Sequence, residues 1–131
     1  MAGNKKILVV EDERDNRNII TIYVKGIGFD AIAVSNGPEA LKTARASLPD
    51  LVLMDLALPG VTGDQVIAQL KADPATQHIP IFIISALPDG ADLFQSALAA
   101  GAEEVFTKPF SFRELGDAIE RYLGKPEAAQ E

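Results

Sequence analysis

The chain has 131 residues, the length of one compact domain with a single hydrophobic core. Its formal net charge of -7 would repel a nucleic-acid backbone, and no basic run offers a local footprint, so we expect no nucleic-acid partner. The sequence contains no cysteine and one histidine, which excludes disulfides, thiolate metal sites and histidine-rich zinc sites. Any bound metal is therefore expected to have oxygen ligands.

The apolar runs are far shorter than the roughly 18 residues that suggest a membrane-spanning helix, and the first residues lack a signal-peptide core. We therefore expect a cytoplasmic protein with no membrane partner. Residues 1–123 are predicted to form one domain. Residues 124–131 contain chain breakers and no apolar face, so they are predicted to be a short flexible tail with no output domain.

Five short apolar segments predict five strands, at residues 7–10, 31–34, 51–54, 81–84 and 105–106. Three of them are continuously apolar, which is typical of strands buried on both faces of a parallel sheet. Apolar residues recur at helical spacing after each strand, and three start signals support the helices: Asn36 to Glu39, Thr62 with Gln65, and Ser111 with Glu114. This alternation predicts an open α/β sheet with right-handed crossovers.

Polar side chains follow four of these strands: Glu11 and Asp12, then Asp55, then Ser85, and finally Lys108. In open α/β sheets functional groups gather beyond the carboxyl ends of the strands, so these side chains are expected to converge. Three neighbouring carboxylates need a cation among them, and Mg²⁺ prefers carboxylate, water and phosphate oxygens. A lysine and a hydroxyl beside an aspartate are suited to phosphoryl transfer onto that aspartate.

Four sequence blocks resemble those of bacterial response-regulator receiver domains: residues 9–13, residues 53–55 with 58–60, residues 85–86 and residues 108–110. Each block alone is weak, but the ordered set with these intervals is specific, and the likeness covers residues 5 to about 123. The resemblance implies a flavodoxin-like, doubly wound parallel sheet of five strands in the order 2-1-3-4-5, with five helices.

The resemblance also implies a function for the polar cluster. Asp55 would accept a phosphoryl group from a histidine kinase or a histidine phosphotransfer protein. Asp12, Asp55 and the backbone carbonyl of Ala57 would coordinate Mg²⁺, for which Mn²⁺ can substitute, and Glu11 would act largely through water. The expected product is an aspartyl phosphate on Asp55.

The remaining site residues follow from the same resemblance. Ser85 would bond the phosphoryl group, Lys108 would pair with it, and the peptide bond to Pro109 is often cis in this family. Receivers commonly place Tyr or Phe three residues before the lysine, as a switch coupled to the hydroxyl, and here that residue is Val105. Phe106 is one step later, so strand alternation predicts that it points to the opposite face. The usual aromatic switch is therefore expected to be missing.

Two expectations concern the phosphorylated state. Ala57 and Leu87, two positions after Asp55 and Ser85, flank the route of attacking water and cannot orient it, so we expect slow decay. Activation is expected to move the segment 85–92 and the fourth helix.

Two other classes share parts of this pattern. A haloacid-dehalogenase-type phosphohydrolase usually has a second aspartate two positions after the first, where this chain has Ala57. A flavodoxin-like electron carrier needs a hydroxyl-rich loop after the first strand, where residues 11–13 would repel the flavin phosphate. We therefore expect a stand-alone receiver that signals through protein–protein interaction and is no enzyme beyond slow self-phosphorylation and self-dephosphorylation. The alternative is a receiver fragment of a larger regulator or hybrid kinase.

Overall fold

The computed structural model describes residues 4–85 and 91–125. Strands and helices alternate along the described chain: β1 Lys6–Val10, α1 Arg14–Gly26, β2 Asp30–Val34, α2 Gly37–Ser47, β3 Leu51–Met54, α3 Gly63–Ala72, β4 Ile81–Ser85, α4 Ala91–Ala100, β5 Glu104–Thr107 and α5 Phe112–Leu123. Every predicted strand is present, and its ends differ from the prediction by at most one residue. Leu87 and most of the segment 85–92, as well as residues 126–131 of the expected tail, lie outside the described residues.

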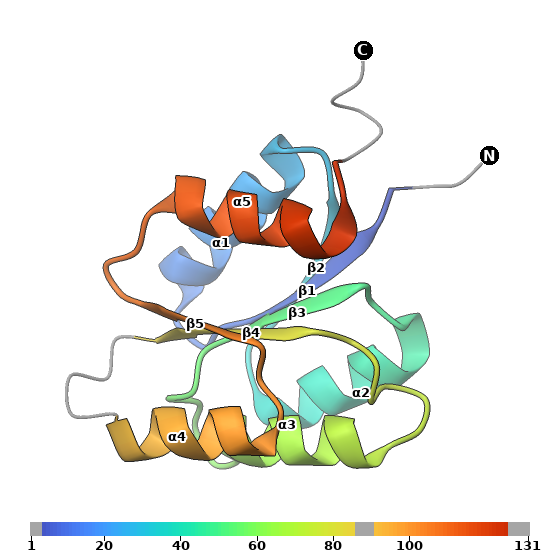
Figure 1. The fold of residues 1–131 in the computed structure, drawn as a ribbon, viewed down its shortest axis with the longest axis vertical. Coiled ribbons are helices and arrows are strands. Elements are labelled where there is room, and N and C mark those ends of the chain that lie inside the picture. The colour runs from blue at the N-terminus through green and yellow to red at the C-terminus, as the bar shows by residue number, and fades with distance from the viewer. Residues whose placement is uncertain (1–3, 86–90, 126–131) are drawn as a thin grey trace.

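The strands form one parallel sheet in the order β2-β1-β3-β4-β5, which confirms the predicted fold class. Figure 1 shows three layers, with α1 and α5 on one face of the sheet and α2, α3 and α4 on the other. Val10 pairs with Val34 and Met54, and Ser85 pairs with Thr107. The chain segments that follow these strands therefore leave the sheet at one edge, the carboxyl edge.

Two hydrophobic cores lie on the two faces of the sheet, because every residue of β3 and β4 and most of β1 is buried. Leu8, Val52 and Ile83 belong to the core under α2, α3 and α4. Successive strand residues point to opposite faces, so their neighbours belong to the core under α1 and α5: Ile7, Val9, Leu51, Leu53, Phe82 and Ile84. The central strands are thus held from both sides.

Val105 and Phe106 follow the same alternation. Val105 packs against the core under α2, α3 and α4, whereas Phe106 packs against the other core. The Phe106 ring lies 5.7 Å from the ring of Phe82, measured between centroids. The prediction that these neighbours face opposite sides of the sheet is confirmed.

Helix caps fix where the connecting loops end. The Asn36 side chain accepts a hydrogen bond from the Glu39 N–H at 2.9 Å, and the Ser111 hydroxyl accepts one from the Glu114 N–H at 3.2 Å.

Across residues 4–85 and 91–125, no helix is long and apolar enough to cross a membrane.

Candidate functional site

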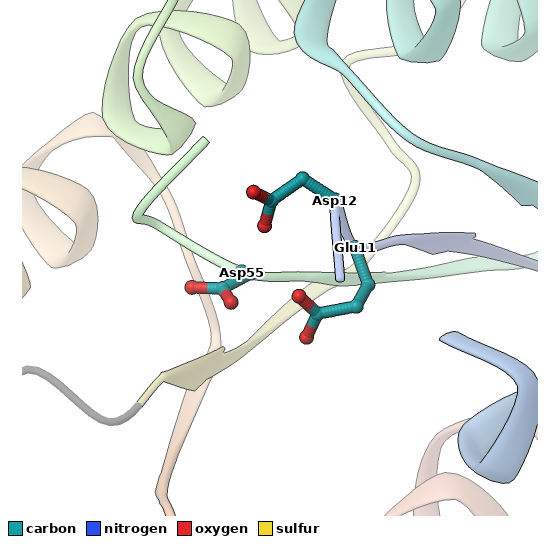
Figure 2. A group of neighbouring side chains, drawn as sticks. All are labelled: Glu11, Asp12 and Asp55. Carbon is teal, nitrogen blue, oxygen red and sulfur yellow. The ribbon is translucent and has the colours of Figure 1, made fainter. Parts of the chain in front are cut away.

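Three carboxylates converge at the carboxyl edge of the sheet. Glu11 and Asp12 follow β1, Asp55 follows β3, and one oxygen from each lies within 4.8 Å of the others. Figure 2 shows the three side chains gathered around one region of the edge. Glu11 and Asp55 are buried, with 2% and 7% of their surface exposed, while Asp12 is exposed. An oxygen-only donor set of this kind suits a hard divalent cation.

Asp55 is held on both carboxylate oxygens. Its Oδ1 accepts hydrogen bonds from the backbone N–H of Ala57 at 2.9 Å and from the fully buried Ser85 hydroxyl at 3.2 Å. Its Oδ2 accepts one from Lys108 Nζ at 3.3 Å. The Asp55 N–H donates to the Val10 carbonyl at 3.0 Å, which continues the pairing of β1 and β3 past the strand end. The sheet therefore sets the position of this carboxylate.

Lys108 joins two of the acids. Its Nζ lies 2.8 Å from Glu11 Oε1 and 3.3 Å from Asp55 Oδ2. Its backbone N–H donates to the Ser85 carbonyl at 2.8 Å, and the peptide bond from Lys108 to Pro109 is cis. In the described part of the chain, Lys108 is the one cation paired with these carboxylates. One ammonium against three carboxylates leaves the cluster formally negative.

Burial is the main cause of the shift at Glu11. It raises the pKa of that carboxyl, the neighbouring Asp55 charge raises it further, and the hydrogen bond from Lys108 partly opposes both. Burial by itself lowers the pKa of Lys108, but the hydrogen bond to Glu11 and the charge of Asp55 outweigh it, so the net pKa is raised. The lysine therefore stays protonated beside the carboxylates.

Two residues that sequence reasoning missed support this edge. Arg17, on α1, donates from Nη1 to the backbone carbonyls of Glu11 at 3.0 Å and Asp12 at 3.3 Å. Gly63, the first residue of α3, donates its N–H to the carbonyl of Leu56, the residue directly after Asp55, at 3.1 Å. An arginine one turn into a helix and a glycine after a threonine are common, so the sequence alone gives no signal for either role.

The fold and the site together define a class of protein. A doubly wound parallel sheet carries an aspartate at one edge, contacted by a hydroxyl and an ammonium group, with an oxygen from each of two further acids within 4.8 Å. This is the arrangement of a phosphoryl-receiving α/β domain. The sequence matches the response regulator receiver domain over residues 7–120, and the chain belongs to this family.

Relatives of known function agree with this assignment. The chain is 35% identical over 120 residues to the polar-differentiation response regulator DivK of Brucella anthropi. The matched region covers 92% of this chain and 97% of DivK. It is 39% identical over 111 residues to the DNA-binding response regulator MtrA of Mycobacterium tuberculosis, covering 85% of this chain and 47% of MtrA. The chain thus spans about half the length of the MtrA-type relatives.

A solved structure carries the same fold. The receiver domain of the sensor histidine kinase PA1611 from Pseudomonas aeruginosa is 29% identical, with a TM-score of 0.84 over 95% of this chain and 100% of that domain. In that crystal structure a magnesium ion is coordinated in the active site cleft.

Proposed function

We propose that this receiver domain accepts a phosphoryl group on Asp55 and signals through a protein partner. The observation that carries the proposal is the setting of the Asp55 carboxylate, which is buried at a strand end between the Ser85 hydroxyl and the Lys108 ammonium. A lone carboxylate in such a place is costly to bury. The position of the Asp55 carboxylate beside two donors suited to phosphoryl oxygens supports a nucleophilic role.

The transfer is an in-line displacement at phosphorus. A carboxylate oxygen of Asp55 forms the new O–P bond while the N–P bond of a phosphohistidine breaks, and the electron pair stays on the imidazole nitrogen. Lys108 and Ser85 stabilise the charge on the equatorial phosphoryl oxygens. The donor is a histidine kinase or a histidine phosphotransfer protein. Receiver domains are signalling domains rather than enzymes in the usual sense, and self-phosphorylation and self-dephosphorylation are proposed to be slow.

Magnesium is the proposed cofactor, and Mn²⁺ is expected to substitute. The residues fit it, because three converging carboxylates share one ammonium group and offer only oxygen. Asp12, Asp55 and the Ala57 carbonyl would hold the ion, with Glu11 acting through water. When bound, the ion neutralises negative charge on the acids and the incoming phosphoryl group. The magnesium found in the related PA1611 receiver supports this proposal.

The chain is proposed to work as a stand-alone receiver in the cytoplasm, without contacting nucleic acid or membrane. The match to nearly all of DivK supports this reading. The longer MtrA relatives favour the alternative, a receiver within a larger regulator. Detecting the native protein in cell extract by its mass would separate the two.

Read-out is proposed to proceed without an aromatic switch at Val105. Valine is stiff at χ1 and is packed into the core under α2, α3 and α4, so it has no ring to rotate inward. Amide chemical shifts of the beryllofluoride complex, which stands in for the aspartyl phosphate, should change in α4 and β5 as a population shift. Changes restricted to the metal pocket would mean that the partner reads the phosphoryl site directly.

Mass spectrometry after incubation with acetyl phosphate and Mg²⁺ tests the central proposal. One added phosphoryl group is expected on the wild type and none on Asp55→Asn. Asp30→Asn, an exposed aspartate at the start of β2, is the matched control and should be labelled like the wild type. Asp12→Ala should lose most of its Mg²⁺ affinity. Labelling of Asp55→Asn at the wild-type rate would contradict the assignment.

A further inference from the structure

The loop that carries two of the acids is tied to helix α1 by one side chain. Arg17 lies in the second turn of α1, and its N–H makes the first helical bond, to the Glu13 carbonyl, at 2.9 Å. Its guanidinium turns back over the helix start, where Nη1 lies 3.0 Å from the Glu11 carbonyl oxygen and 3.3 Å from the Asp12 carbonyl oxygen. One donor thus bridges two successive carbonyls of the acidic loop.

Other bonds fix the ends of this loop but not the Asp12 carboxylate. The Glu11 N–H donates to the Val34 carbonyl at 3.1 Å, and the Glu13 N–H donates to Glu11 Oε2 at 3.2 Å. In the described residues, no hydrogen bond or ion pair reaches the Asp12 side chain. Its direction therefore depends on the backbone, and Arg17 contacts that backbone.

The three carboxylates of the cluster also repel one another. Like charges within 4.8 Å repel, and Lys108 compensates Glu11 and Asp55 but makes no ion pair with Asp12. Repulsion therefore favours a loop that swings Asp12 away from Asp55. Arg17 resists that movement through the backbone, and it leaves the carboxylate oxygens free because it forms no ion pair with any of the three acids.

We propose that Arg17 is a positioning residue for the cation site: by holding the Glu11 and Asp12 carbonyls it presets the acidic cluster for a divalent ion. This inference rests on the proposed function of the site. Removing partners that orient metal ligands typically costs about 10- to 100-fold in affinity, and we expect about tenfold here because Asp12 and Asp55 remain.

Arg17→Met is the main test, since it keeps the aliphatic stem and removes the donors. Arg14→Met is the matched control, because it removes the same charge from an exposed arginine one turn earlier on α1. Mg²⁺ affinity is measured from amide chemical shifts in a titration, and the rate of phosphorylation by acetyl phosphate is measured across Mg²⁺ concentrations. Urea unfolding establishes that each variant is folded.

For Arg17→Met we expect the half-saturating Mg²⁺ concentration to rise about tenfold over that of Arg14→Met, with the rate at saturating Mg²⁺ within about twofold of wild type. A purely structural tie would lower stability and leave the Mg²⁺ dependence unchanged. Arg17→Lys, which restores a donor, should recover most of the affinity. If Arg17→Met does not fold, Arg17→Gln, too short to span both carbonyls, takes its place with the same expectation.

Equal half-saturation in Arg17→Met and Arg14→Met would overturn the proposal, and so would an Arg17→Lys variant as weak as Arg17→Met. A wild-type protein that neither binds Mg²⁺ nor becomes phosphorylated would instead refute the proposed function itself. The two failures are therefore distinguishable.

Discussion

Gly63→Ala should displace Asp55, the proposed phosphoacceptor, through the backbone, because the first residue of α3 packs directly against the segment that follows Asp55. A Cβ added at Gly63 would lie 2.8 Å from the Leu56 Cα and 2.9 Å from the Asp55 carbonyl oxygen. Carbon atoms pack at about 3.5–4.0 Å, so the two backbones must separate by about 0.7 Å or more. The opposing atoms belong to the main chain and to a buried side chain, so neither side yields easily.

The cost has two parts. Overpacking of a buried site costs about 1–3 kcal/mol of unfolding free energy. A shift of about 1 Å in a reacting group can cost about 100-fold in rate, so the smaller shift expected at Asp55 should slow phosphorylation by about 10- to 100-fold. Both effects come from one methyl group whose three nearest heavy atoms belong to Leu56 and to the Asp55 backbone.

Urea unfolding and timed mass spectrometry with acetyl phosphate measure the two effects. The matched control is Gly26→Ala at the end of α1, where an added Cβ meets no heavy atom within 4 Å and the backbone is not left-handed. That variant should gain about 0.5–1 kcal/mol from helix propensity and keep the wild-type rate. A Gly63→Ala protein as stable and as rapidly phosphorylated as Gly26→Ala would refute the reasoning.

Three further predictions concern the helix end, the phosphorylated state and the tyrosines. Leu48 caps α2 in the left-handed region at φ 47°, so Leu48→Gly should be more stable to urea than Leu48→Ala by about 1 kcal/mol. Ala46→Gly, inside the same helix, should instead be less stable than the wild type by about 1 kcal/mol. If glycine were more stable than alanine at both positions, or less stable at both, the prediction would be contradicted. Ala57→Asn places a polar side chain beside the site, where it can hydrogen-bond the attacking water. One such hydrogen bond, worth about 1.4 kcal/mol, should speed the decay of the aspartyl phosphate about tenfold, as followed by mass spectrometry. An unchanged half-life would show that the side chain at position 57 does not reach the water. Burial, and then nearby carboxylates, raise the pKa of Tyr23 and Tyr122, so their ultraviolet titration should have a higher midpoint in folded protein than in urea-unfolded protein. Because the raised pKa belongs to the folded state, this contribution to stability is complete below the ordinary tyrosine pKa and is lost as pH rises through the folded value.

Much of the fold was readable from the sequence for a simple physical reason. Strands β1, β3 and β4 are buried on both faces, so their apolar runs are continuous and their ends are sharp. In a parallel sheet those ends meet at one edge, which brought the acids, the serine and the lysine together without any knowledge of the loops. The opposite orientations of Val105 and Phe106 followed from strand alternation alone.

The contacts that tune the site were not readable in the same way. Lys108 was expected to meet a phosphoryl group, but its shortest contact is with Glu11, 97 positions away in sequence. The Arg17 bridge and the Gly63 contact depend on how helices sit on the loops, and local propensity carries no information about that placement. Periodicity locates elements to within a residue or so, whereas a hydrogen bond needs positions to within a fraction of an ångström.

The site also shows why a folded domain tolerates so much unfavourable charge at one edge. Glu11 is buried with its pKa raised, and Lys108, the cation paired with it, is shared with Asp55. Because the backbone of each acid is fixed, by the sheet at Asp55 and by Arg17 at Glu11 and Asp12, the repulsion cannot relax by moving the acids apart. Local departures from stabilising rules of this kind concentrate at functional sites. A divalent cation among the three carboxylates would relieve this repulsion, so the unfavourable charge of the cluster favours cation binding.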